Sequence, residues 1–203
     1  MLSRFHFPPR RARWLAAAVV VAAIAIGAPA VGRAQSPPLM EGPHPFARDN
    51  EVSAHVLLGT GVGDSPSGAK LAVDYGYHLG GATWLNLEAN GQFGGCGSGP
   101  GPCGNGPVFE TMAGGKWKFA TSVPVVVHAK AAGGLVYVFP DDGRAALGVA
   151  LRGGGGATYF FYDWIGVGLE ACFSLGHVSY ESTYNHDATY AVVDFGGGVE
   201  VQF

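Results

Sequence analysis

The stretch that decides the fold covers residues 70–79 and reads Lys-Leu-Ala-Val-Asp-Tyr-Gly-Tyr-His-Leu. Every second residue from Leu71 to Leu79 is apolar, and the residues between them are small, polar or charged. Successive side chains of a β-strand point to opposite faces, so this spacing predicts a strand with one apolar and one polar face. Lys70 and Asp74 fall on its polar face.

Seven further runs show the same alternation, and turn residues separate them. Eight strands are enough to close a narrow barrel, and the number is even. We therefore predict an all-β fold, an antiparallel up-and-down barrel over residues 50–203. The other runs cover residues 52–59, 85–93, 109–119, 125–139, 145–161, 165–175 and 191–203.

The polar face carries charges of both signs in equal number, whereas the apolar face of the runs carries none. An isolated charge inside a protein is costly, so ions enclosed by the barrel must be paired. The glycines and alanines that lie between these charged residues leave room for their long side chains. We therefore expect a lumen that is filled by side chains and does not steadily conduct ions. The predicted lumen charges are Lys70, Asp74, Glu88, Glu110, Lys116, Lys118, Lys130, Arg144, Arg152, Glu170, Asp194 and Glu200.

The chain is poor in charge for a water-soluble protein. Only 13% of its residues are charged, against about a quarter in soluble domains. With the polar face turned inward, the apolar face needs a lipid surrounding, which makes the barrel a transmembrane one. Aromatic residues near both ends of the runs fit the two membrane interfaces; they are Tyr75, Tyr77, Trp117, Phe119, Tyr159, Phe161 and Phe203 at one end, and Phe93, Phe109, Tyr137 and Phe139 at the other.

Residues 1–34 are typical of a secretory signal peptide, with basic residues before an apolar core and small residues after it. The alternative is an uncleaved anchor formed by residues 14–31. Residues 35–49 read as a Pro-rich lead-in. Five of the twelve basic residues lie in the signal, so cleavage after Ala34 leaves seven against fifteen acidic residues. A chain this acidic is unsuited to nucleic acid.

The remaining polar residues predict few ligand sites. Cys96 and Cys103 are expected to form a small disulfide ring, with two free thiols as the alternative, and Cys172 is expected as an unpaired lumen thiol. His55, His78 and His128 are expected in the hydrogen-bonded lumen network rather than as metal ligands. We expect no metal and no cofactor.

The connections between the runs differ in length at the two ends of the predicted barrel. Tight turns at Gly80-Gly81 and Tyr162-Asp163 indicate the periplasmic end, and the connection at residues 140–143 is a short exception at the other end. Residues 94–106 and 178–187 are expected to be external loops that make any surface contacts.

The chain ends in Val199-Glu200-Val201-Gln202-Phe203, an alternating run that stops at a terminal Phe. This resembles the C-terminal signature of outer-membrane proteins, which their assembly machinery reads. The whole pattern resembles the small barrels that include OmpX and the OmpA transmembrane domain. The resemblance implies a bacterial outer-membrane location, contact with membrane lipids and lipopolysaccharide, and a monomer with a structural or surface-interaction role.

A second functional class comes from His177 and Ser179. Two residues apart on a strand, they share one face, and such a pair can act as base and nucleophile. The pair resembles that of the PagL lipid A deacylases, although Tyr180 stands where that family has Asn, and Asp187 is the nearest acid on the next run. A small-solute channel is the third alternative.

Overall fold

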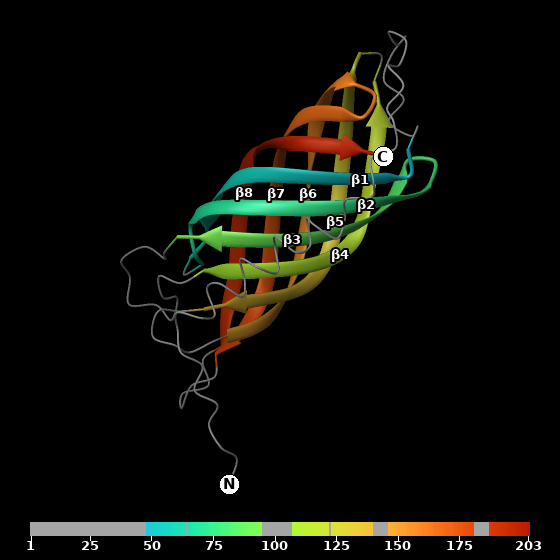
Figure 1. Ribbon diagram of the computed structural model, residues 1–203. Helices are drawn as coiled ribbons and strands as arrows, with labels where there is room; N and C mark the ends of the chain where they lie inside the picture. Colours follow the sequence, from blue (N-terminus) through green and yellow to red (C-terminus); the bar gives the residue numbers. More distant parts are fainter. Residues whose placement is uncertain (1–47, 64, 95–106, 122, 140–145, 181–186) are drawn as a thin grey trace. The chain divides into compact units, whose positions relative to one another are not determined.

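The computed structural model describes residues 48–63, 65–94, 107–121, 123–139, 146–180 and 187–203. In this part of the chain, each strand pairs antiparallel with the next, and β8 pairs with β1, so that the sheet closes into a barrel (Figure 1). The strands are β1 (Asn50–Gly61), β2 (Gly68–Gly80), β3 (Thr83–Phe93), β4 (Val108–Ala120), β5 (Val125–Val138), β6 (Ala146–Tyr162), β7 (Ile165–Tyr180) and β8 (Asp187–Gln202).

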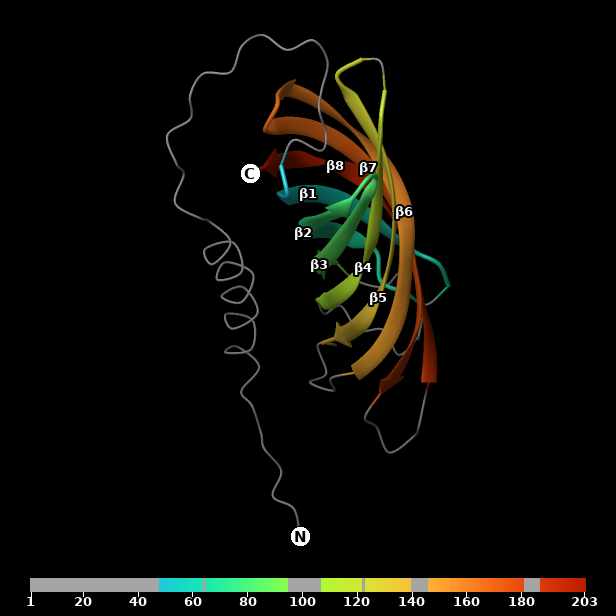
Figure 2. The same cartoon turned by 90° about the vertical axis from the view of Figure 1, so that its right-hand side faces the viewer.

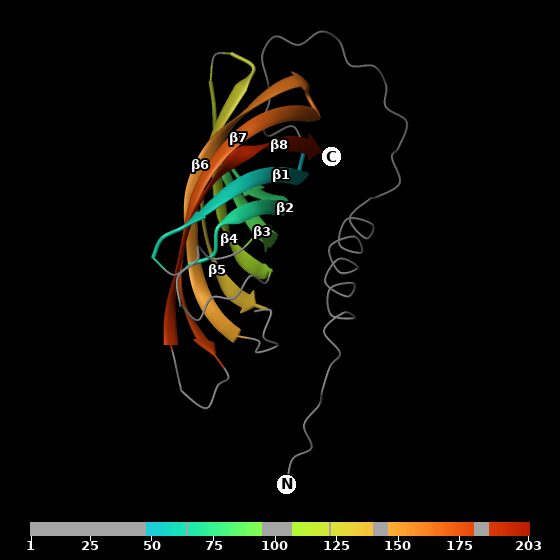
Figure 3. The same ribbon diagram turned by 90° about the vertical axis from the view of Figure 1, so that its left-hand side faces the viewer.

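The predicted eight-stranded barrel is confirmed, and each alternating run lies in one strand. In Figures 2 and 3 the strands wind obliquely around the barrel, and β8 lies beside β1. The ends of the barrel sequence meet at this seam. Asn50 N–H donates to Phe203 O at 3.1 Å, and Phe203 N–H donates to Asn50 O at 2.9 Å.

The alternation separates an apolar outside from a charged inside. On the outer face, the side chains of Leu58 and Leu151 are 69% and 72% exposed. On the inner face, Lys70 is 1% exposed, and every predicted lumen charge that the structure describes is buried in the same way. The polar face therefore lines the interior, as expected.

The short connections all lie at one end of the barrel, which we call the turn end. They join β2 to β3, β4 to β5 and β6 to β7, at residues 81–82, 121–124 and 163–164. The connections at the other end, the loop end, are longer, and they fall between Gly61 and Gly68, Phe93 and Val108, Val138 and Ala146, and Tyr180 and Asp187. The connection after β5 was predicted to be a short exception at the loop end. It is instead longer than the turns of the turn end, like the other connections of the loop end.

The expected loop at residues 178–187 is shorter than predicted, because β7 continues through Tyr180. Within this segment, Val178 is buried with the apolar side chains of the interior. The signal peptide, the lead-in up to residue 47 and the alternative anchor lie outside the described residues. Among the residues that the structure describes, no helix is both long and apolar enough to span a membrane.

Glycines on the inner face leave room for the charged side chains. Gly76 of β2 pairs with Glu51 of β1, and a methyl group on Gly76 would lie 2.5 Å from Glu51 Cγ. By contrast, a methyl group on Gly153, on the outer face of β6, would meet only a backbone oxygen at 3.8 Å.

We expect Gly76→Ala to destabilise the barrel by about 1–3 kcal/mol, the usual cost of overpacking a filled interior. Gly153→Ala is the matched control, and it should leave the free energy of unfolding unchanged or raise it slightly, because alanine has the lower conformational entropy in the unfolded chain. Urea unfolding of both variants in detergent micelles measures the difference. Equal midpoints for the two variants would show that Gly76 provides no needed space.

Candidate functional site

The barrel interior holds the largest concentration of reactive and charged side chains in the described part of the chain. Eleven of the twelve predicted lumen charges lie there, and Arg144 is outside the described residues. The sequence analysis missed Glu51, which is fully buried beside them. The alternation could have predicted this position, since Glu51 continues the polar face that includes Ser53 and His55.

Four of the interior charges form the turn-end cluster: Glu51, Lys116, Lys118 and Glu200. Lys116 Nζ lies 2.8 Å from Glu51 Oε1, and Lys118 Nζ donates to the carboxylates of both Glu51 and Glu200. Lys118 Nζ also lies 4.5 Å from the centre of the Trp84 ring, a cation–π contact. Two ammonium groups and two carboxylates balance in this cluster.

Another four charges form the loop-end cluster: Lys70, Glu110, Arg152 and Asp194. Lys70 Nζ lies 2.6 Å from Glu110 and 3.0 Å from Asp194, and Arg152 also contacts Asp194. The Tyr190 hydroxyl donates to Glu110 at 2.7 Å. The charges of this cluster balance as well.

The remaining charges form the central cluster, in which Lys130 faces Asp74, Glu88 and Glu170. Lys130 Nζ lies 3.6 Å, 3.3 Å and 2.8 Å from these three carboxylates. Arg152 reaches into the cluster through Nε, 3.1 Å from Glu88. The Lys130 ammonium group thus pairs with three carboxylates. The Arg152 guanidinium also contacts one of them, Glu88, while it pairs with Asp194 in the loop-end cluster.

Two of the three predicted lumen histidines join the central cluster. His55 Nε2 lies 3.7 Å from Asp74, and His128 Nε2 lies 3.4 Å from Glu170. His78 lies apart from them at the turn end, where its ring stacks on Trp84 with centroids 4.9 Å apart. Cys172 is a buried free thiol whose Sγ lies 3.2 Å from Glu170 Oε1.

Beside the loop-end cluster, part of the interior is apolar, which was not predicted from the sequence. Ten buried side chains from β4 to β8 pack together there, and they include Val136, Val178 and Val192. Val136 falls in phase with Lys130 on the inner face, so the periodicity could have placed it inside. Together with Trp84 at the turn end, these side chains fill the barrel on both sides of the central cluster.

The predicted hydrolase pair lies on the opposite surface. His177 and Ser179 are exposed on the outer face of β7 near the loop end. In the register of β7 with β8, Thr189 is opposite His177, and Asp187 is opposite Ser179. The backbone therefore brings an acidic residue next to the predicted serine. Cys96 and Cys103 lie outside the described residues, and their disulfide stays a prediction.

Removal of one interior charge should be costly, because its partners stay buried. We expect Arg152→Met to destabilise the barrel by about 3–5 kcal/mol, measured by urea unfolding in detergent micelles. Asp194→Asn in the Arg152→Met background should recover part of this loss, since it removes one carboxylate from an interior left with still more negative than positive charge. The control Asp49→Asn changes a residue that is 76% exposed and should stay within about 0.5 kcal/mol. A loss no larger than that of the control would contradict the paired interior.

Comparison with known proteins finds similarity at the level of structure. No protein-family model matches the chain, and no curated protein matches it. Neisserial surface protein A (NspA) superposes with a TM-score of 0.56 at 14% identity, over 76% of this chain and 96% of that one. The N-terminal β-barrel domain of Pseudomonas aeruginosa OprF gives 0.47 at 13%, over 75% and 98%. Ail of Yersinia pestis gives 0.45 at 14%, over 81% and 100%.

At such identities, the similarity to NspA concerns the fold alone. It agrees with the closed eight-stranded barrel described above. This chain therefore has the closed, eight-stranded, antiparallel barrel fold of small outer-membrane proteins such as NspA.

Proposed function

We propose that this chain is a bacterial outer-membrane barrel with a structural or surface-interaction role. The observation that carries the proposal is the inversion of the usual pattern, with ions inside and aliphatic side chains outside. Val56, Leu58, Leu151 and Leu169 are all exposed on the outer face. Soluble monomers rarely expose apolar patches of more than a few hundred Å², whereas a lipid bilayer removes such a surface from water.

The aromatic residues support this location. Near the turn end, Tyr159 packs against Phe161 and Tyr162 stacks on Trp164, with centroids 5.5 Å and 6.3 Å apart. At the loop end, Phe109 contacts both Phe93 and Phe139. Aromatic girdles at both interfaces, short periplasmic turns and longer external loops are features of outer-membrane barrels. The turn end would then face the periplasm.

The filled interior supports a role without steady conduction. Ion pairs occupy the barrel interior, and apolar side chains of β4 to β8 pack together toward its loop end. The protein would therefore bind its partners through its outer surface. The wall of the barrel would contact membrane lipids and lipopolysaccharide, and external loops such as residues 94–106 would contact other partners. The closed sheet has no free edge, which suits a monomer. Phe203 would serve the assembly machinery as its terminal signal.

The location is tested by fractionating cells that express the full chain. We expect the protein in the outer-membrane fraction, where it should migrate differently on a gel before and after heating, because detergent alone does not unfold a closed barrel. A sample unfolded in urea before loading is the control, and it should migrate like the heated protein. Recovery in the soluble or inner-membrane fraction would overturn the proposal.

A second candidate function is hydrolysis of an ester bond in lipid A, for which the pairing of Ser179 with Asp187 is the specific observation. His177 and Ser179 lie on the lipid-facing side near the external surface, where such a substrate would be reached. In an activated nucleophile the third group orients the histidine; in this register Asp187 is diagonal to His177, and Thr189 is directly opposite it.

This candidate is tested by measuring fatty acid release from lipid A by the purified protein. An active enzyme should lose this activity in Ser179→Ala and keep it in Thr60→Ala, which removes an exposed hydroxyl from the outer face of β1. Equal release by Ser179→Ala and the unchanged protein would remove the candidate, and so would the absence of release.

A further inference from the structure

The described barrel interior holds more negative than positive charge. Besides His55 and His128, its buried side chains include five lysines and arginines (Lys70, Lys116, Lys118, Lys130 and Arg152) and seven carboxylates (Glu51, Asp74, Glu88, Glu110, Glu170, Asp194 and Glu200). The turn-end and loop-end clusters each contain two of either sign. With the histidines counted neutral, the excess of two negative charges belongs to the central cluster, where Lys130 is the one lysine among three carboxylates, beside His55 and His128.

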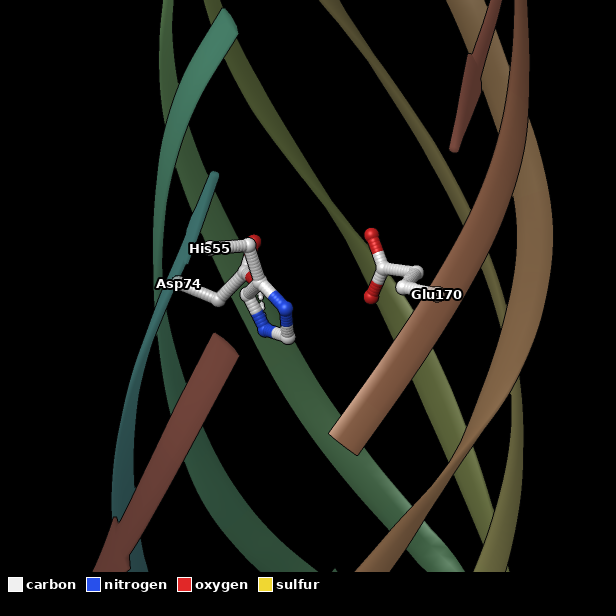
Figure 4. A group of neighbouring side chains, drawn as sticks. All are labelled: His55, Asp74 and Glu170. Atoms are coloured by element: carbon white, nitrogen blue, oxygen red, sulfur yellow. Dashed lines mark ion pairs between the residues drawn. The ribbon is translucent and has the colours of Figure 1, made fainter. Parts of the chain in front are cut away.

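Three side chains from different strands converge where this excess of negative charge lies. Figure 4 shows the His55 ring and Asp74, from β1 and β2, on one wall of the barrel, with the Glu170 carboxylate of β7 facing them across the interior. One donor atom from each residue lies within 4.8 Å of the others. His55 Nε2 and Asp74 Oδ2 are 3.7 Å apart, close to the ~3.4 Å that separates two ligands of a tetrahedral zinc ion with bonds of about 2.1 Å.

Both carboxylates of this group have a buried oxygen without a hydrogen-bond partner among the described residues, Asp74 Oδ1 and Glu170 Oε2. Their nearest cationic or imidazole contacts are longer than good hydrogen bonds, 3.6 Å from Lys130 Nζ to Asp74 Oδ1 and 3.4 Å from His128 Nε2 to Glu170 Oε2. The other oxygens are engaged, since Ser53 Oγ donates to Asp74 Oδ2 at 3.1 Å and Lys130 Nζ lies 2.8 Å from Glu170 Oε1. Buried polar atoms are nearly always satisfied, so the arrangement indicates a further electrophile between the three side chains.

The His55 ring is held in place by the packing of the barrel wall. His55 is 6% exposed and pairs with Gly198 of β8, and a methyl group on Gly198 would lie 2.6 Å from His55 Nδ1. A glycine at this position lets the ring lie against the wall beside Asp74. His128 contacts the Glu170 carboxylate at 3.4 Å and completes the polar surroundings.

From the charge excess and these convergent donors, we infer that His55, Asp74 and Glu170 bind one divalent transition-metal cation of the zinc type inside the barrel. A nitrogen and two carboxylate oxygens suit zinc, and a charge of plus two balances the central cluster. Lys130 stays paired with the second oxygen of Glu170. The inference departs from the expectation that His55 only shares in a hydrogen-bonded network, because the sequence did not show that the acidic excess lies beside this ring.

The test uses the full chain without an affinity tag, refolded in detergent with zinc chloride or with EDTA, because the packed interior limits entry of an ion after folding. After dialysis, elemental analysis should find about one zinc per folded chain, and urea unfolding should need more denaturant for the zinc-loaded protein, since a ligand that binds only the folded state stabilises it. Failure to retain zinc, with equal midpoints for both samples, would overturn the inference.

Two variants and one control locate the ion. His55→Gln and Glu170→Gln should each lower zinc affinity at least about tenfold, because even partners behind the ligands cost about 10–100-fold. His78→Gln is the matched control: it removes a histidine of the turn end, and zinc retention should be unchanged. Heat-dependent migration verifies that each variant is folded. Retention of zinc by folded His55→Gln would overturn the site. The site would also be overturned if the unchanged protein folded without zinc and its urea midpoint changed with pH as the histidines become protonated.

Discussion

The structure depends on the requirement that every ion enclosed by the barrel has a counter-ion within reach. A buried charge without a partner costs several kcal/mol, and the wall offers no route to water for groups such as Lys118 or Arg152, which are almost fully buried. The charged side chains meet this requirement by reaching across the interior to other strands. Arg152 of β6, for example, contacts Glu88 of β3 and Asp194 of β8. The ion pairs thereby tie together strands that are not neighbours in the sheet.

The composition of the wall follows from the same requirement. Long charged side chains need space, and the inner face provides it through glycines such as Gly76 and Gly198, which lie directly beside Glu51 and His55. The outer face needs no such arrangement, because its leucines and valines have no polar atoms to satisfy. The glycines of the inner face are thus a consequence of putting ions inside a narrow barrel.

The alternation in residues 70–79 and in the seven other runs predicts the strands and their two faces, because a strand has a period of two whatever its neighbours are. The closure was predicted from the even number of eight runs. The same period of two would have placed Glu51, Trp84 and Val136 inside. The sequence does not reveal which charges meet, since depth in the barrel depends on the register between strands. The concentration of acidic groups around His55, and the position of Asp187 opposite Ser179, both follow from that register.

The seam between Asn50 and Phe203 joins the residues that lie furthest apart along the barrel sequence. The entropic cost of closing a chain segment grows with its length, so this contact is the most expensive one to form by diffusion, and no hairpin connection brings its partners together. The first seven strands can assemble as a growing ribbon of hairpins, but their two outer edges stay unpaired until β8 arrives. A ribbon with open edges tends to aggregate. The pairing of β8 with β1 is therefore the step that protects the protein from its own edges.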